Sequence, residues 1–374
     1  MATTATSARA GGGTAPAALD GAQPALRRRW WSAWPRWSAV LAVAWSALYG
    51  LAALYWSLGG DGFPFAKVHN DRASASLLEP SPAPVVAPLI AVFCAAGVAA
   101  GIRMLRAPDS TRHRKLLLGY GWTAAVGLGL LIPDYSILGL LVFSPALLVF
   151  VFTGVPGPQD LGDILYWHRI NIIIVFIGGV LWLGATLAHQ RRTARQCVRC
   201  GRSGKAAAAW TRPEAALRWG RWAVWGAVAA TIPYDITRIA WYFGRPLGIT
   251  DGFLKEMQDT PGMLEMGLAL GLASTLGSLL THGLISRWGE IWPRWVWFKK
   301  GGVIHPATAL VPAGVMAAVI VPGGLMSIRH FETAEWGALG PSILWVFWGV
   351  GLGIAAFSYY LRRRGECAYC HRGA

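Results

Sequence analysis

Charged residues are scarce in this chain. They make up 14% of its 374 residues, whereas soluble domains carry about 25%, so an ordinary soluble globular protein is excluded. Acidic residues are the scarcer kind, with 18 Asp and Glu against 34 Lys and Arg. No phosphate-binding loop, nucleophile elbow or zinc-protease helix motif occurs in the sequence. ATP hydrolysis and proteolysis are therefore not expected.

Apolar residues take the place of the missing charge. They form 54% of the chain, and its mean hydropathy is +0.42. Apolar runs of roughly 20 residues recur, which is the length that a helix needs to cross a bilayer. The predicted fold class is therefore an all-α polytopic membrane protein. Eight spans are expected, at about 37–57, 84–105, 116–133, 169–189, 221–243, 263–285, 306–328 and 341–361.

The N-terminal segment differs from the rest. Residues 1–26 are mostly Ala, Thr, Gly and Pro, a composition that predicts a disordered tail. The first apolar run begins only after Arg27, Arg28 and Arg29 and is long enough to stay in the membrane as a span, so no secretory signal fits.

A further apolar run at 136–154 is long enough to cross, but the basic residues argue against a crossing. If this run does not cross and the N-terminus is cytosolic, 27 of the 34 Lys and Arg lie on the cytosolic side, in agreement with the positive-inside rule. We therefore expect a re-entrant or interfacial hairpin at 136–154, with Pro145 interrupting a helix. The predicted location is the plasma (inner) membrane with both termini cytosolic. The expected partners are the lipid bilayer and its anionic headgroups, and not nucleic acid.

The sequence also indicates a duplication. Residues 36–59 align without gaps on residues 221–244, and an apolar helix, an arginine cluster and a Cys-x-x-Cys pair follow one another both after Val175 and after Val346. Each copy has four predicted spans, an even number, so both copies have the same orientation. Some transporters use such parallel repeats, related by an axis along the membrane normal. The predicted parts are a tail at 1–26, a first repeat at 27–202 that contains the extra apolar run as an insertion, and a second repeat at 203–374.

The outer end of the first span in each copy carries the only family resemblance. The segments ALYWSLGGDGF and RIAWYFGRPLGITDGF contain Trp56 with Gly59 and Trp241 with Gly244. This pattern resembles a Trp-x-x-Gly motif of uncharacterised actinobacterial multi-pass membrane proteins. The resemblance implies a helical membrane bundle and carries over no activity and no catalytic residue.

Four of the five cysteines form two pairs at equivalent points of the repeats, Cys197 with Cys200 and Cys367 with Cys370. The expected topology puts them in the reducing cytosol, where a structural disulfide is not expected. If the repeats bring the pairs together, the four thiolates form the usual ligand set of structural zinc, and neighbouring arginines favour the thiolates. Two alternatives stay open: unliganded or redox-active thiols, and c-type haem attachment at the Cys-x-x-Cys-His sequence that ends in His371. A zinc site in which His371 replaces one cysteine is a variant of the first hypothesis.

Two ionisable residues, Asp235 and Arg238, interrupt the fifth predicted span. They lie three residues apart and so share a helix face, and ionisable residues within a span usually face the bundle interior or water. One interpretation is a ligand-binding site for a substrate or proton that also includes Tyr234, Asp134 and Glu265 at the same level. The other is a self-neutralising pair in which Arg238 extends to the outer surface.

Three functions follow from these patterns as hypotheses. The first is a permease for a small molecule or ion, or a ligand-binding membrane protein, with its site in the outer half of the interface between repeats and the insertion as a lid. The second is a membrane scaffold or regulator that is locked by a cytosolic zinc site and binds a cytosolic protein or a second copy of the chain. The third is a membrane-embedded enzyme on a lipid-like substrate, with Asp235, Asp134 or Glu265 as acid or base. Fold alone does not decide among them.

Overall fold

Helices form the regular structure of the protein. The computed structural model describes residues 33–67, 76–153, 161–204, 208–294, 296–297, 299–333 and 335–373, and these ranges contain no β-strand. The predicted all-α class is therefore confirmed for the described residues. The disordered tail expected at 1–26 lies outside them.

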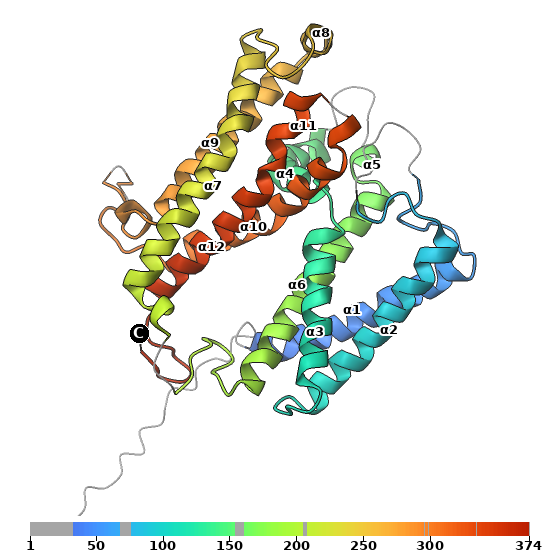
Figure 1. The fold of residues 1–374 in the computed structure, drawn as a ribbon, viewed down its shortest axis with the longest axis vertical. Helices are drawn as coiled ribbons and strands as arrows, with labels where there is room; N and C mark the ends of the chain where they lie inside the picture. Colours follow the sequence, from blue (N-terminus) through green and yellow to red (C-terminus); the bar gives the residue numbers. More distant parts are fainter. Residues whose placement is uncertain are drawn as a thin grey trace, which may run out of the picture. The chain divides into compact units, whose positions relative to one another are not determined.

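The α-helices are labelled in chain order (Figure 1). Their bounds are α1 (Trp34–Ser57), α2 (Ala83–Arg106), α3 (Arg114–Val126), α4 (Ser136–Thr153), α5 (Leu161–Ile164), α6 (Trp167–Thr193), α7 (Pro213–Tyr242), α8 (Asp251–Asp259), α9 (Met263–Gly283), α10 (Pro306–Arg329), α11 (Trp336–Ile343) and α12 (Trp345–Arg363). A π-helix, η2 (Gly127–Leu131), continues α3. Several helices start at a proline or at a capping side chain, as at Thr250, whose Oγ1 accepts the N–H of Phe253 before α8.

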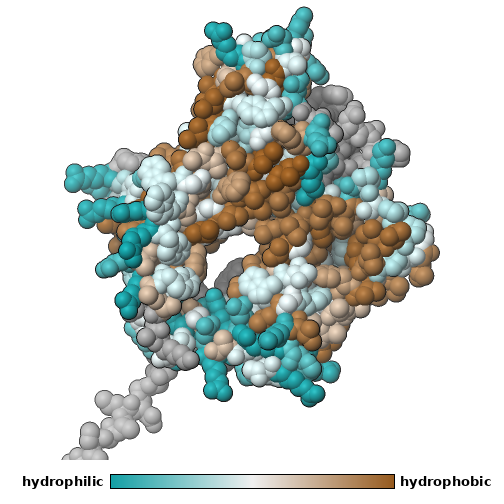
Figure 2. Space-filling model, viewed as in Figure 1, coloured by the Kyte–Doolittle hydropathy of each residue, from teal (hydrophilic) through white to brown (hydrophobic). Residues whose placement is uncertain are grey.

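Six helices are long and apolar enough to cross a membrane. They are α1, α2, α6, α9, α10 and the pair α11–α12, which runs from Trp336 to Arg363. They coincide with six of the predicted spans. Figure 2 shows hydrophobic side chains over the middle of the helices and hydrophilic ones gathered toward the loops at their ends. The chain is thus a membrane protein, as its composition predicts.

The span expected at 116–133 and the following hairpin have a different shape. Helix α3 with η2 is bent by 60° from α4, so the two form either a broken span or a re-entrant loop. Helix α4 is continuous across Pro145, so the interruption expected at that proline is wrong, whereas the re-entrant or interfacial arrangement expected for 136–154 stays a prediction. Membrane helices tolerate an internal proline when neighbouring groups satisfy the freed carbonyls, and Ser144 Oγ donates to the carbonyl of Leu141. The break lies instead just before α4, where Pro133 lacks an N–H and the Asp134 carboxylate accepts the N–H of Ser136 at 2.8 Å.

Helix α7 covers the span expected at 221–243 except for its last residue but is not among the six. Asp235 and Arg238 lower its mean hydropathy, and its buried face packs against α9 and α12. By length and composition, the described residues thus provide six spans, or seven if the bent pair is one span, so the eight expected spans are not confirmed.

The helices α1, α2, α3 with η2, and α6 surround one buried cluster. Trp182 of α6 is fully buried and donates its indole N–H to Ser46 of α1 at 3.2 Å. Tyr49 of α1 donates to the side-chain oxygen of Asn171 in α6 at 2.8 Å. Gly97 of α2 lies against the hydroxyls of Tyr120 and Ser46, with which a side chain at this position would collide. Hydrogen bonds between helices and close contacts at small residues hold membrane bundles together.

The helices α7, α9, α10 and α12 surround a second buried cluster. Ser358 of α12 donates to the carbonyl of Ala216 in α7 at 2.8 Å, at a point where Gly220 leaves room for it. Thr231 of α7 and Ser278 of α9 share a hydrogen bond of 2.8 Å. Helix α10 also contacts η2 and α4, and so connects the second group of helices to the first.

Candidate functional site

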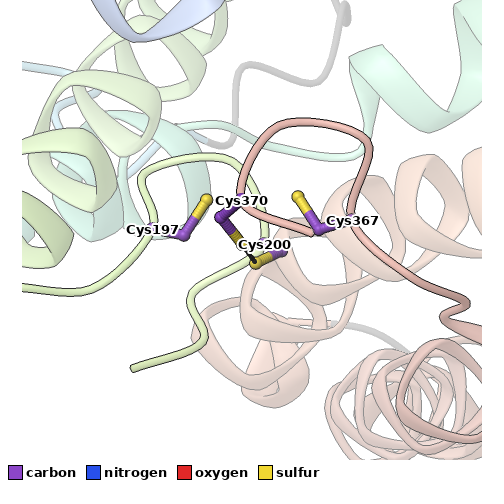
Figure 3. Close-up of side chains that lie close together, drawn as sticks. All are labelled: Cys197, Cys200, Cys367 and Cys370. Carbon is purple, nitrogen blue, oxygen red and sulfur yellow. Dashed lines mark hydrogen bonds between the residues drawn. The ribbon is translucent and has the colours of Figure 1, made fainter. Parts of the chain in front are cut away.

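Both Cys-x-x-Cys pairs lie in loops that follow a membrane helix. The first cysteine loop (residues 197–202) follows α6, and the second cysteine loop (residues 367–372) follows α12. Each of the two helices ends in arginines, where the apolar sequence stops. Figure 3 shows the four cysteine side chains gathered between the two loops.

The two cysteine loops have the same backbone hydrogen bonds. The first cysteine of each loop donates its N–H to the carbonyl of the arginine five residues later, at 2.8 Å in the first loop and 3.1 Å in the second. Its own carbonyl accepts the N–H of the residue four positions later, at 2.7 and 2.8 Å. That residue has a positive φ in both loops, 72° at Gly201 and 51° at His371. The equivalent sequences therefore form equivalent turns.

The sulfur atoms of Cys197, Cys200, Cys367 and Cys370, here named the four-cysteine cluster, all lie within 4.8 Å of one another. Those of Cys200 and Cys370 are 3.6 Å apart. In a tetrahedral site with Zn–S distances of about 2.3 Å, neighbouring sulfurs are about 3.8 Å apart. The cluster has the size and the ligand type of a metal site, and the four predicted metal ligands are brought together.

The thiols of the cluster differ in acidity. Burial raises the pKa of Cys367, but hydrogen bonds with the backbone N–H groups of Tyr369 and Cys370 and with the thiols of Cys200 and Cys370 together bring it down to about 6. Burial also raises the pKa of Cys197, but hydrogen bonds with two backbone N–H groups of its own loop and with the thiols of Cys200 and Cys370 together outweigh this effect, so the net pKa is lowered. Burial raises the pKa of Cys200 to about 12. The thiols of Cys197 and Cys367 are therefore more acidic than an ordinary cysteine, and a bound metal ion deprotonates a coordinating thiol.

Two arginines connect the cysteine loops directly. Arg202 donates to the carbonyl of Gly365 at 2.9 Å and also to the carbonyl of Arg372. Arg372 in turn donates to the carbonyl of Arg202 at 3.0 Å. This reciprocal pair joins segments 170 residues apart, and the rigid fork of the guanidinium suits such paired contacts.

Further cationic groups lie beside the cluster. Arg191 of α6 donates to the carbonyls of Val198 and Arg199 at 2.8 and 3.1 Å. The Arg199 guanidinium lies 4.6 Å from the centre of the Tyr369 ring in the other loop. Four thiolates around one divalent cation carry a net negative charge, which nearby arginines stabilise.

His371 lies outside the four-cysteine cluster. Its side chain is 79% exposed, and its Nδ1 lies 3.6 Å from the carboxylate of Glu366. It occupies the turn position that glycine holds in the first loop. An arrangement of four sulfurs from two loops favours a metal site over c-type haem attachment, which uses one cysteine pair with its histidine.

The predicted outer site does not form one constellation. Asp235 accepts a hydrogen bond from Thr275 of α9 at 3.0 Å, and its other oxygen is buried without a partner. No salt bridge joins it to Arg238 in the described part of the chain. Arg238 instead donates to two carbonyls of α11 at 3.1 and 3.0 Å and lies over the rings of Tyr234 and Trp241, at 4.3 and 4.2 Å. Of the five predicted residues, only Arg238 and Tyr234 contact each other in this way.

The two remaining carboxylates have separate surroundings. Asp134 is buried, and its hydrogen bond to the N–H of Ser136 supports the start of α4. Glu265 is exposed in the first turn of α9. Each of these carboxylates therefore has a local environment of its own.

The described residues also line an open cavity of about 620 Å³ that the sequence did not reveal. Residues of α4, α7, α9, α10 and α12 line it, together with the segment between α9 and α10. Tyr234 is the one residue of the predicted outer site in its wall. The insertion contributes to the same wall through residues of α4, among them Leu138 and Phe143.

Two features of the site escaped sequence reasoning. The reciprocal Arg202–Arg372 contact had a signal, since each arginine stands two positions after the second cysteine of its pair. The sequence signal for the cavity was weaker. Trp288 and Trp292, which lie on its wall, belong to a tryptophan-rich basic segment. Its position depends on which helices pack together, which the sequence does not specify.

Comparison with known proteins assigns no family. No protein-family model, curated protein or solved structure matches the chain. Function is therefore inferred from geometry and chemistry alone.

Proposed function

We propose that this chain is a zinc-binding membrane protein, a scaffold or regulator in which one structural zinc ion fastens α6 to α12. One observation carries the proposal: four thiols from loops 170 residues apart lie within 4.8 Å of one another. Catalytic zinc keeps an open position for water or substrate, whereas four cysteines complete the tetrahedral coordination. The ion would therefore act on structure and not on a substrate.

The proposal includes two like-oriented four-helix repeats with eight spans. Equivalent turns support it beyond the cysteine loops. Gly59 after α1 and Gly244 after α7 have φ values of 93° and 71°, and each donates its N–H to the carbonyl of the tryptophan three residues earlier. In this arrangement α7 is a span, because its neighbours α9 and α11 supply partners for Asp235 and Arg238.

The same proposal assigns both cysteine loops to the cytosolic face of the plasma membrane. The positive-inside rule supports this orientation, since 27 of the 34 Lys and Arg then lie on that face. The reducing cytosol keeps the thiols available for metal. The basic face so formed would bind anionic headgroups and would be open to a cytosolic protein or to a second copy of the chain.

The permease and enzyme hypotheses stay predictions. Both depend on the outer polar residues, and these have separate partners in the structure. Substitution of Asp235 by asparagine tests both hypotheses. Loss of ligand uptake or of turnover on a lipid-like substrate, with unchanged protein abundance in the membrane, would favour them over the scaffold.

Metal analysis tests the zinc site. The full chain is purified in detergent without added metal, and zinc is counted per chain by inductively coupled plasma mass spectrometry. We expect one zinc per chain in the wild type and none when all four cysteines of the cluster are changed to serine. Cys94→Ala is the matched control, because Cys94 is buried in α2 away from the cluster; it should keep its zinc.

Two results would contradict the proposal. One is a wild-type protein that contains no zinc after purification from zinc-replete cells. The other is a quadruple variant that retains zinc at the wild-type level, since the ion would then lie elsewhere. A His371→Ala variant with normal zinc content would show further that the histidine is not a ligand.

A further inference from the structure

The cavity of about 620 Å³ lies between α9 and α10. Helix α9 packs against α7, and α10 packs against α12, while α7 and α12 pack against each other. The side chains of Tyr234, Trp345 and Trp348 therefore form the back wall. Helix α4 adds Leu138 and Phe143 to the lining. Small-molecule sites in proteins have volumes of about 300–1,000 Å³ and mostly apolar walls, so the cavity has the dimensions of a ligand site.

The wall of the cavity is suited to hydrocarbon. Aliphatic and aromatic side chains dominate it, and its side-chain hydroxyls are few, among them those of Thr281 and Thr308. Apolar cavities exclude water, and an empty cavity costs packing free energy. In a membrane, the molecules at hand to fill such a space are lipid chains.

The length of the cavity favours a long chain. Its wall along α9 and the helical residue that follows α9 extends from Leu270 to Leu284. These fourteen steps along a helix correspond to about 21 Å at 1.5 Å per residue. One leaflet of the hydrocarbon core is about 15 Å thick, so a chain that enters from one surface can extend past the middle of the membrane.

A basic hollow adjoins the end of the cavity that is nearest the loop after α9. The hollow shares Trp288, Trp292 and Pro293 with the cavity, and Arg287, Arg294 and Lys300 also line it. Trp288 and Trp292 are thus placed between the apolar and the basic part, as tryptophans are at the headgroup level of membranes.

The basic hollow has little acidic charge to neutralise it. Glu290 is the only acidic residue between Leu284 and His305. Its carboxylate is already paired with Arg362 of α12 at 2.7 Å and lies 4.0 Å from Arg363. In the described part of the chain no salt bridge involves Arg287, Arg294 or Lys300, so these cations are left to attract an anion from outside.

We propose that this cavity is a binding site for an anionic membrane phospholipid. One acyl chain lies between α9 and α10, and the phosphate lies in the basic hollow near Arg287, Arg294 and Lys300. The basic residues of the hollow belong to the loop between α9 and α10, and basic residues next to membrane helices on the cytosolic side, where the proposed topology puts this loop, attract anionic headgroups. The apolar cavity and the adjoining basic hollow together match the two parts of such a lipid. This site is separate from the four-cysteine cluster and does not depend on it.

The test uses the full chain in nanodiscs of phosphatidylcholine with a minor fraction of phosphatidylglycerol. The protein is extracted in mild detergent, and the lipid that stays bound is identified by mass spectrometry. We expect about one phosphatidylglycerol per chain, enriched over phosphatidylcholine relative to the nanodisc. Arg287→Glu with Arg294→Glu should lower this enrichment about thirtyfold, roughly 2 kcal/mol. The control Arg112→Glu reverses an exposed charge in a different basic loop and should have no effect.

A second pair of variants tests the apolar part. Ala273→Trp fills the cavity from α9 and should abolish bound lipid of either kind, whereas Leu272→Trp, at a neighbouring exposed position outside the cavity wall, should not. Gel filtration and zinc content monitor the fold of every variant. Absence of retained lipid in the wild type would overturn the proposal. Two results would overturn the assignment of the phosphate to the basic hollow. One is retained lipid with the same composition as the nanodisc. The other is a loss of phosphatidylglycerol enrichment in Arg112→Glu equal to that in Arg287→Glu with Arg294→Glu.

Discussion

Oxidative cross-linking between the cysteine loops tests their convergence without metal. In a Cys197→Ser/Cys367→Ser variant, Cys200 and Cys370 remain, with sulfurs 3.6 Å apart. A disulfide requires about 2.05 Å, so modest side-chain rotation is sufficient. We expect mild oxidation to form this bond. Because it closes a loop of 170 residues, chain-entropy arguments give an upper limit of about 5 kcal/mol for its stabilisation, and a denatured state that stays in the membrane lowers this value.

The assay separates the two halves of the chain. A protease site inserted between Ala208 and Ala209 leaves one cysteine loop in each fragment. After cleavage, the oxidised variant should run at full-length mass on a non-reducing gel and as two fragments on a reducing gel. The midpoint of its thermal unfolding should also be higher than that of the reduced form. A variant that also lacks Cys200 should give two fragments on both gels. Oxidised fragments that separate under both conditions would refute the convergence of the loops.

Three substitutions test the packing, each by thermal unfolding in detergent. Gly179→Val should lower the free energy of unfolding by about 1–3 kcal/mol, since a Cβ at Gly179 would lie 2.5 Å from a backbone nitrogen of η2. The control Gly119→Ala, at a position with open space around it, should leave the stability unchanged. Equal effects of the two substitutions would contradict the close approach of α6 to η2. Arg238→Gln should cost about 2–3 kcal/mol through its lost contacts with α11 and two aromatic rings, and a neutral result would favour an arginine that extends to the surface. Tyr49→Phe should lower the stability by about 1 kcal/mol, because the side-chain oxygen of Asn171 loses its hydrogen-bond donor. Adding Asn171→Ala to the Tyr49→Phe variant should not lower the stability further.

The parts of the structure that local sequence determines were predictable. Apolar runs bounded by basic residues fix six of the spans, since length and hydropathy are local properties. The meeting of Cys197 with Cys367 was predictable only because the flanking sequences repeat. The repeat gave both loops an equivalent place after a helix, and the loops then adopted the same turn.

The parts that depend on tertiary contacts were not predictable. Arg238 binds carbonyls of α11, about 100 residues away in sequence, and no spacing rule links the two segments. The break before α4 is different, because it is local: Asp134 accepts the N–H of Ser136, and the interruption was expected at Pro145 instead. The cavity arises where α9 and α10 each pack on a different neighbour, and a list of spans does not contain that information.

The distance in sequence between the two cysteine loops has a consequence for biosynthesis. The ribosome releases the first pair long before it has made the second, so the nascent chain holds two thiols without their counterparts while α7 to α12 are inserted. If the four-cysteine cluster binds metal as proposed, its set of ligands is complete only when Cys370, which follows α12, has left the ribosome. A truncated or wrongly inserted chain would present an open thiol pair, which distinguishes it chemically from a correctly assembled protein.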